Sequence, residues 1–284
     1  MAPNATGFYE PISNEECLKC AFEREIPPCG FDYSLLKYIY SHKRYRALDI
    51  HVSDLLVCPR RAWYDKQIEY PETAASRFIV TLGTLQHALL EEMEDETYLA
   101  ENIVETSDGN VVGTVDAYYH NGRIVDYKTT RNANLKYLPQ KKHAMQVNIY
   151  AHMLRAMHKK HPERFPNTPV GEDPVKSAAI QYIDFLGPTK CPRCKSFVVT
   201  GPEDVLICPL CEVPVDNAHL GALLLPVKLW SEEKIAELVE ERADYLQKCI
   251  DDRKIPEQTE PDFLCRYCPF LGLCQEGQAE ITRR

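Results

Sequence analysis

Two aspartates and a lysine lie close together near the middle of the chain, in a stretch that could hold a metal ion and cleave a phosphodiester. They are Asp116, Asp126 and Lys128, and valine, isoleucine and tyrosine fill the residues around them. A cation held by two carboxylates polarises a phosphoryl oxygen and lowers the pKa of bound water, while a nearby ammonium orients the water or stabilises the developing charge. The alternative is a surface hairpin with solvated charges, which is the favoured interpretation of Asp-x-Lys when the motif stands alone.

The element that must position these side chains is a β-hairpin over residues 113–128. A two-residue Asn-Gly turn would pair His120 with Arg123 and place the two aspartates on opposite faces. A three-residue loop with Gly122 in the left-handed conformation pairs Tyr119 with Arg123, which sets the aspartates across from each other with the lysine on the same face. We favour this register, or a bulge with the same effect, because facing carboxylates repel each other unless a cation lies between them.

Composition limits the class of protein. The 284 residues are 44% hydrophobic and 26% charged, as in a soluble globular protein of one elaborated domain or two. The chain has no apolar run of membrane-spanning length, and its start lacks the features of a secretory signal, so we expect a cytoplasmic protein without a membrane partner. The net charge of −9 argues against nucleic-acid binding by the whole surface. Any contact with DNA must come from local basic patches or bound metals.

The twelve cysteines are grouped in Cys-x-x-Cys pairs, which in a chain without an export signal favours metal or cluster ligation over disulfides. Two such pairs, thirteen residues apart, form an insertion over about 189–219 that is typical of a zinc ribbon. Its expected ligands to a structural Zn²⁺ are Cys191, Cys194, Cys208 and Cys211.

The C-terminal tail offers three more thiols, Cys265, Cys268 and Cys274, and needs a distant fourth. Cys58 is the best candidate, because it is otherwise a lone cysteine flanked by basic and aromatic residues. Four thiolates suit an iron–sulfur cluster or zinc, and spacing alone does not choose between them.

Residues 1–50 form a cysteine-bearing extension. Cys17, Cys20 and Cys29 lack an evident fourth ligand; Cys249 or a histidine would supply one, or the three are buried small residues. Basic and aromatic residues alternate over 41–46, which is compatible with binding of single-stranded nucleic acid, although a solvated helix end is the favoured interpretation of this pattern alone.

Hydrophobic periodicity predicts helices and strands around the hairpin. Ser53 and Ser231 are good N-cap residues, and Gln146 and Tyr150 share a helix face because they are four residues apart. The predicted helices run over 53–64, about 76–96, from 139 to before 160, and 231–252. The predicted strands run over 98–105, 175–185 and 221–230, with a loop over 160–175.

The order of these motifs resembles the RecB-like branch of the PD-(D/E)XK nucleases and, more closely, the CRISPR-associated Cas-four exonucleases and their phage relatives. The resemblance covers about residues 53–275, and the joint pattern is far more specific than any of its parts. The residues that carry it are Cys58, His87, Gly113-x-x-Asp116, Asp126-Tyr-Lys128, Gln146-x-x-x-Tyr150 and Cys265-x-x-Cys268-x5-Cys274.

The resemblance implies an α/β fold with a restriction-endonuclease-like core, in which helices flank a central mixed sheet. It implies that His87, Asp116 and Asp126 coordinate Mg²⁺ or Mn²⁺ with the carbonyl of Tyr127. Lys128 would be the catalytic lysine, and Gln146 and Tyr150 would position the lysine region and the substrate. The ligands implied for a [4Fe-4S] cluster are Cys58, Cys265, Cys268 and Cys274.

We therefore expect a nuclease domain over 51–275 that is interrupted by the insertion over 189–219. The expected activity is metal-dependent exonucleolytic hydrolysis of DNA at single-stranded ends, in CRISPR adaptation, recombination or repair and with a protein partner from such a complex. The alternative is a DNA-binding or adaptor module that uses the same fold and ribbon. The insertion and the N-terminal extension depart from the family's minimal pattern and leave the substrate and partner open.

Overall fold

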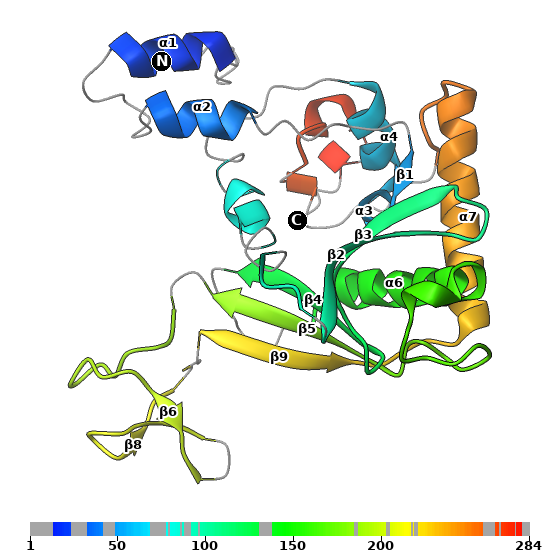
Figure 1. The fold of residues 1–284 in the computed structure, drawn as a ribbon. Coiled ribbons are helices and arrows are strands. Elements are labelled where there is room, and N and C mark those ends of the chain that lie inside the picture. Colours follow the sequence, from blue (N-terminus) through cyan, green and yellow to red (C-terminus); the bar gives the residue numbers. More distant parts are fainter. Residues whose placement is uncertain are drawn as a thin grey trace. The chain divides into compact units, whose positions relative to one another are not determined.

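The computed structural model divides the chain into two compact units (Figure 1). One comprises Met1–Leu48, Arg60–Gln86 and Glu257–Arg284, and the other comprises Asp49–Pro59 and His87–Pro256. The structure describes residues 14–23, 33–41, 49–68, 78, 80–85, 87, 92–95, 97–130, 138–184, 187–202, 205–216, 218, 221–257, 265–266, 268–275 and 277–279. The predicted domain boundaries stay predictions.

A mixed sheet forms the centre of the larger unit, in the order β1-β3-β4-β5-β9, and β2 pairs with β3 as well. The pairs β3–β4, β2–β3 and β5–β9 are antiparallel, while β1–β3 and β4–β5 are parallel. The sheet strands are β1 (Ile50–His51), β2 (Tyr98–Glu105), β3 (Val111–Tyr119), β4 (Arg123–Thr130), β5 (Ser177–Asp184) and β9 (Ala222–Val227). The central mixed sheet of the predicted fold class is therefore present.

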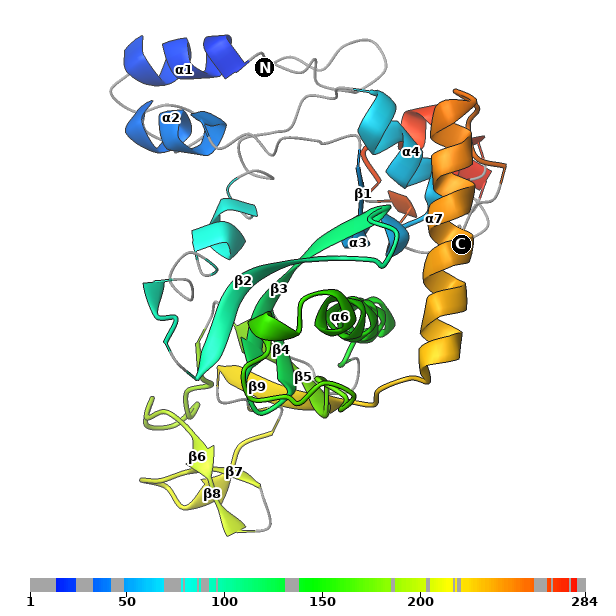
Figure 2. The ribbon, with the colours of Figure 1, turned by 45° about the vertical axis from the view of Figure 1, so that its right-hand side comes forward.

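One long helix packs on this sheet, and a second long helix packs on the first (Figure 2). Helix α6 (Lys141–Lys160) packs on β2, β4 and β5 and also contacts α7 (Glu232–Asp251). Apolar side chains at helical spacing make the contact face of α7, where Ile235, Val239, Ala243 and Leu246 are buried. Ser231 caps α7 as predicted, because its side chain accepts a hydrogen bond from the backbone N–H of Lys234.

The predicted strand over 221–230 was too long, because β9 ends at Val227. The backbone of the residues after β9 forms hydrogen bonds with a buried side chain of α6, Asn148. Its Oδ1 accepts from the N–H of Trp230 at 2.6 Å, and its Nδ2 donates to the carbonyl of Lys228 at 3.3 Å. The segment between β9 and α7 is therefore fixed by α6 and not by the sheet.

The single helix predicted from Ser53 to residue 64 was also wrong. The chain forms α3 (Val52–Leu55) and α4 (Pro59–Gln67), with a break between them. Proline disfavours the helical conformation of the residue before it and is well tolerated at the first position of a new helix. The cap of α3 is His51, whose backbone N–H donates to a carboxylate oxygen of Asp54 at 2.8 Å.

The smaller unit contains α1 (Asn14–Glu23), α2 (Tyr33–Ser41) and most of α4. Ala21, Leu36 and Tyr40 form a small core between α1 and α2. Near the C-terminal 3-10 turn η5 (Leu271–Leu273), Tyr64 packs against Phe270 with ring centroids 5.3 Å apart, and its hydroxyl donates a hydrogen bond to the carbonyl of Leu273.

Several predictions for the N-terminal extension fall on residues that the structure leaves undescribed. These are the side chain of Cys17, the whole of Cys29 and most of the basic and aromatic run at 41–46. Cys20 is a free, half-buried thiol. Among the described residues, no helix combines the length and apolar character required to span a lipid bilayer.

A small second sheet lies between β5 and β9 in the sequence (Figure 1). It consists of β6 (Val199–Thr200), β7 (Leu206–Cys208) and β8 (Val213–Pro214), all antiparallel. The strands that bracket it in the sequence pair with each other, and the N–H of Asp184 donates to the carbonyl of Gly221 at 2.7 Å. The predicted insertion is thus an elaborated connection within an antiparallel pair of strands.

Candidate active site and cysteine centres

The β3–β4 turn has the register that brings the aspartates together. Tyr119 pairs with Arg123, and Gly122 has a φ of 87° in the left-handed region. The ladder between β3 and β4 stops at the pair Ala117–Val125. Strand β2 covers one edge of β3 along most of its length, so β1 and β4 share the other edge and β4 leaves β3 after three pairs.

The candidate active site lies where these strands part. Instead of a ladder bond, the backbone N–H of Tyr127 donates to Asp116 Oδ2 at 2.7 Å. Lys128 Nζ donates to Asp126 Oδ1 at 2.9 Å, and His87 Nδ1 lies 3.5 Å from Asp116 Oδ1. The structure therefore brings together the two aspartates, the lysine and the histidine that the sequence singled out.

Burial dominates the electrostatics of this site. Asp126 is fully buried and Asp116 is 5% exposed. Burial raises the pKa of both carboxyl groups, that of Asp116 to about 7 with a further contribution from the charge of Asp126, while Lys128 and His87 oppose the shift. Lys128 Nζ lies 2.8 Å from Asp126 Oδ2 as well, but that buried oxygen accepts no well-directed hydrogen bond from any residue that the structure describes.

Two buried carboxylates and an imidazole form a donor set that suits a hard divalent cation. A cation would neutralise the repulsion between the carboxylates. The residues present therefore fit Mg²⁺ or Mn²⁺. Their ligating atoms are less tightly gathered than those of the cysteine cluster described below, which within the described part of the chain is the one group whose ligand atoms all lie within 4.8 Å of one another.

Gln146 and Tyr150 lie on α6, and Gln146 Nε2 donates to the Tyr150 hydroxyl at 2.9 Å. Tyr150 is buried against β3: a methyl group built on Gly113 would come within 2.9 Å of its ring. The pair is thereby attached to the strand that carries Asp116.

The sequence interpretation missed His143, which lies beside this site. Its Nδ1 is 2.9 Å from the hydroxyl of Tyr182, which also accepts from the N–H of Gln140 at 3.2 Å. Tyr182 is the residue of β5 that pairs with Lys128 of β4. Burial, with the positive charge of Lys128, lowers the pKa of His143 to about 3, so the imidazole is neutral where it contacts the Tyr182 hydroxyl. The signal was its position three residues before Gln146, on the same helix face.

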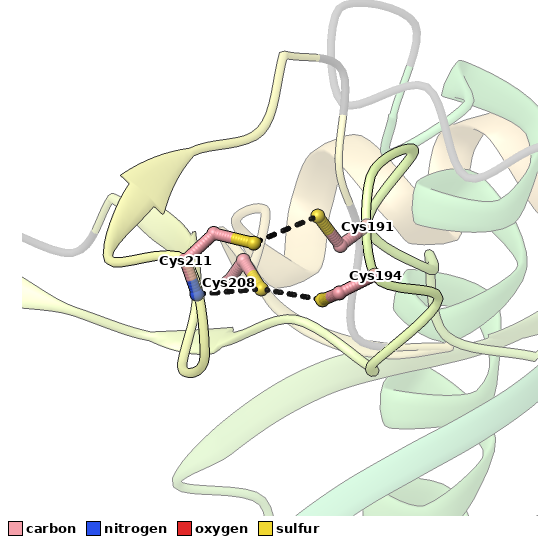
Figure 3. A group of neighbouring side chains, drawn as sticks. All are labelled: Cys191, Cys194, Cys208 and Cys211. Atoms are coloured by element: carbon pink, nitrogen blue, oxygen red, sulfur yellow. Dashed lines mark hydrogen bonds between the residues drawn. The ribbon is translucent and has the colours of Figure 1, made fainter.

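The four cysteines of the insertion converge as predicted (Figure 3). The Sγ atoms of Cys191 and Cys211 are 4.0 Å apart, and those of Cys194 and Cys208 are 3.3 Å apart. Four sulfurs at 2.3 Å from a tetrahedral zinc ion would be separated by about 3.8 Å. The observed distances lie on either side of that value, so the cluster fits a tetrahedral thiolate site.

The two Cys-x-x-Cys turns have the same backbone geometry, with the residue after each in the left-handed region. Lys195 has a φ of 65° and Glu212 a φ of 55°. The N–H of Lys195 donates to the Cys191 carbonyl at 3.0 Å, and that of Glu212 donates to the Cys208 carbonyl at 2.8 Å. The N–H of Cys211 also donates to Cys208 Sγ at 3.3 Å. Backbone hydrogen bonds therefore preform both halves of the site.

The tail cysteines lie together in the smaller unit. The N–H of Cys268 donates to the carbonyl of Cys265, and a methyl group built on Gly277 would lie 3.5 Å from Cys274 Sγ and 3.7 Å from Cys265 Cβ. Burial raises the pKa of the Cys268 thiol. Cys58 belongs to the other unit, so a common site for all four thiols stays a prediction.

Comparison with known proteins identifies the family. A model of the PD-(D/E)XK nuclease superfamily matches residues 103–275, which include Asp116, Asp126, Lys128 and the α6 pair. The match covers more than half of the chain. The chain belongs to the PD-(D/E)XK nuclease superfamily.

Among curated proteins, the chain is similar to CRISPR-associated exonuclease Cas4 of Saccharolobus solfataricus, with 35% identity over 122 residues. The match covers 38% of this chain and 58% of that protein, so it spans little more than half of the relative's length.

Two solved structures show a looser likeness. The crystal structure of SSO0001 matches with a TM-score of 0.44 and 18% identity over 86% of this chain and 95% of that one. A phage-related exonuclease from Haemophilus somnus 129PT matches with a TM-score of 0.39 and 12% identity over 72% of this chain and 95% of the other. The family assignment therefore comes from the sequence match alone.

Proposed function

We propose that this protein is a metal-dependent deoxyribonuclease that hydrolyses phosphodiester bonds exonucleolytically at single-stranded ends. The observation that carries the proposal is the divergence of β3 and β4, which leaves two buried carboxylates, an imidazole and an ammonium facing one position. A scaffold without catalysis has no need of facing buried carboxylates, because they destabilise the fold.

His87, Asp116 and Asp126 would hold Mg²⁺ or Mn²⁺, with the carbonyl of Tyr127 as a further ligand. A divalent ion supplies Lewis acidity toward the phosphoryl oxygen and lowers the pKa of water. Lys128, held by its contact with Asp126, would orient the attacking water or stabilise the charge that develops on the phosphate. Gln146 and Tyr150 would position the substrate beside β3.

The sharpest test compares Lys128→Ala with Lys176→Ala, an exposed lysine that precedes β5. Each protein is incubated with end-labelled single-stranded DNA while Mn²⁺ is titrated. We expect the wild type and the Lys176 variant to shorten the DNA from an end, and the Lys128 variant to lose at least a hundred-fold in rate, as expected when a stabiliser of transition-state charge is removed. Cleavage at the wild-type rate by Lys128→Ala would contradict the mechanism, and binding without degradation by the wild type would favour the adaptor alternative.

We also propose a [4Fe-4S] cluster on Cys58, Cys265, Cys268 and Cys274, and Zn²⁺ on the four cysteines of the insertion. Anaerobically purified protein should be brown and absorb visible light, and Cys268→Ser should remove the absorption, because the cluster needs all its thiolates. Cys208→Ser should keep the colour and lower the zinc content. A colourless wild-type preparation that contains zinc alone would contradict the cluster.

The similarity to a CRISPR-associated exonuclease suggests that the protein acts in CRISPR adaptation with a protein partner. Recombination and repair use the same chemistry on DNA ends. Pull-down of the tagged protein from its own host, followed by identification of the bound proteins, separates these settings.

A further inference from the structure

The first half of the insertion carries several exposed basic and apolar side chains within residues 190–199, and we call this set the ribbon face. It consists of Lys190, Arg193, Lys195, Phe197 and Val199. Phe197 is 50% exposed and Val199 is 42% exposed, although each is a large apolar residue. Val198, between them, is 3% exposed and faces the inside of the ribbon. The alternation places Phe197 and Val199 together on the outer side of the strand.

A cation lies directly over the exposed ring. Lys190 and Phe197 form an isolated β-bridge, and Lys190 Nζ is 5.0 Å from the centroid of the Phe197 ring. The thiols Cys191 and Cys208 are buried inside the ribbon. The cysteine cluster is therefore shielded, while half of the Phe197 side chain is exposed to solvent.

The charge of the ribbon is divided between its halves. Residues 187–202 contain three basic residues and no acidic residue, whereas residues 203–219 contain four acidic residues and no lysine or arginine. None of the three cations forms an ion pair with a carboxylate among the residues that the structure describes. The first half of the insertion is thus positively charged within a chain of net charge −9.

These cations could instead offset the negative charge of a zinc–thiolate centre. Their contacts do not favour that role, because Lys195 Nζ donates to the carbonyl of Pro192 at 3.1 Å and Lys190 Nζ lies over the ring of Phe197. Neither ammonium is directed at a sulfur. Their placement fits an external anion better than the thiolate cluster.

We propose that the ribbon face binds single-stranded nucleic acid, with a base stacked on Phe197 and phosphates contacted by Lys190, Arg193 and Lys195. An aromatic platform flanked by basic side chains is how proteins bind unpaired strands without regard to sequence. Backbone phosphates complement the positive charge, and a duplex cannot offer an unstacked base to the ring. The proposal adds a substrate contact to the proposed nuclease function, but binding at this face does not require cleavage.

The aromatic contact is tested by fluorescence anisotropy with a labelled thymidine oligonucleotide, in buffer without added divalent metal. We expect Phe197→Ala to weaken binding about ten-fold and Phe197→Tyr to restore it, because each stacked base contributes that order of affinity. Leu210→Ala removes an even more exposed apolar side chain from the other Cys-x-x-Cys turn and should bind like the wild type. Unchanged affinity of Phe197→Ala would overturn the proposal.

The charge contact is tested by the salt dependence of the same binding. Neutralising Lys190, Arg193 and Lys195 to Gln should lower the slope of log affinity against log salt by about 2, because single strands lose about 0.7 per phosphate contact. The control replaces Lys159, Lys160 and Lys248, three exposed lysines of α6 and α7, by Gln for the same change in charge. An equal loss in both triple variants would mean a general charge effect and would sink the assignment.

The experiments distinguish failure of the ribbon-face proposal from failure of the proposed nuclease activity. A wild type that binds the oligonucleotide through Phe197 but never cleaves it would refute the nuclease and leave the ribbon face intact. A wild type that cleaves normally and binds equally with every ribbon variant would refute only the ribbon face.

Discussion

Burial of Asp116 and Asp126 makes the stability of the metal-free fold depend on pH. Their folded-state pKa values are raised above the ordinary 3.8, that of Asp116 to about 7, chiefly by burial. The neutral Asp116 carboxyl group stabilises the fold fully below pH 3.8, and this contribution is lost as the pH rises through about 7; the contribution of Asp126 has the same sign. A cation at the site would restore the lost stability at neutral pH, so folding of the site and binding of the ion are linked.

His143 contributes to the stability of the fold with the opposite dependence on pH. Its pKa is lowered from 6.5 to about 3, so the stability it supplies is complete above pH 6.5 and is lost as the pH falls toward 3. His143→Asn keeps a side chain that can hydrogen-bond to the Tyr182 hydroxyl but does not titrate. Between pH 6.5 and 5 the variant should lose about 2 kcal/mol less stability than the wild type.

Urea unfolding at several pH values measures this difference. The control is His161→Asn, which changes an exposed histidine just beyond α6. Parallel losses in the wild type and the His143 variant would show that His143 is not held neutral.

At the scale of elements, the attachment of α6 to β3 depends on a glycine. A methyl group built on Gly113 would lie 2.8 Å from Val52 Cγ2 and 2.9 Å from Tyr150 Cε1, and both neighbours are buried. Gly113→Ala should therefore destabilise the protein by about 1–3 kcal/mol, the usual cost of overpacking. Denaturant unfolding measures the change.

The matched replacement is Gly83→Ala, in a helical segment with open space around the glycine. It should be neutral or stabilising by up to about 1 kcal/mol, because alanine favours the helix. Equal unfolding midpoints for the two variants would mean that Val52 and Tyr150 move aside freely.

The features that could be predicted from the sequence are those that depend on residues close together in the chain. They are the turn at Gly122, the cap at Ser231 and the cysteine spacings. The point where β3 and β4 part depends on β1, which pairs with β3 from 61 residues earlier at Ile50–Val111. The residues near the hairpin do not indicate that β1 and β4 share one edge of β3. The sequence therefore predicted facing aspartates but not the separation of the two strands.

Other misses share this cause. The end of β9 depends on Asn148, 79 residues before Val227, which accepts the N–H of Trp230. The environment of His143, which lies on α6, depends on Tyr182 of β5. In contrast, the break between α3 and α4 was readable from Pro59, because proline restricts the residue before it.

At the scale of the whole molecule, the insertion should be separable from the nuclease core. The strands before and after it pair directly, with Ile183 opposite Ala222 and the N–H of Asp184 bonded to Gly221. Replacing residues 185–220 by Asn-Gly, a favoured hairpin turn, should leave a folded core whose Tm changes by only a few degrees. Circular dichroism and thermal unfolding measure the result.

A partial deletion provides the comparison. Removing only Cys208–Cys211 would leave the other two thiols of the cluster without partners, and we expect this protein to unfold earlier than the full deletion. If instead the full deletion aggregates while the partial one is stable, the insertion is part of the core.

The hydrogen bond from the Tyr127 backbone to the Asp116 side chain replaces a ladder bond between β3 and β4. Truncating this side chain to alanine would remove the proposed ion ligand and also leave the Tyr127 N–H without its acceptor, so an inactive Asp116→Ala variant would not reveal which loss was responsible. An asparagine keeps an oxygen for that peptide group while discarding the charge. Amide substitutions therefore distinguish the structural role of these carboxylates from their proposed role in catalysis, because they remove the charge and keep a hydrogen-bond acceptor.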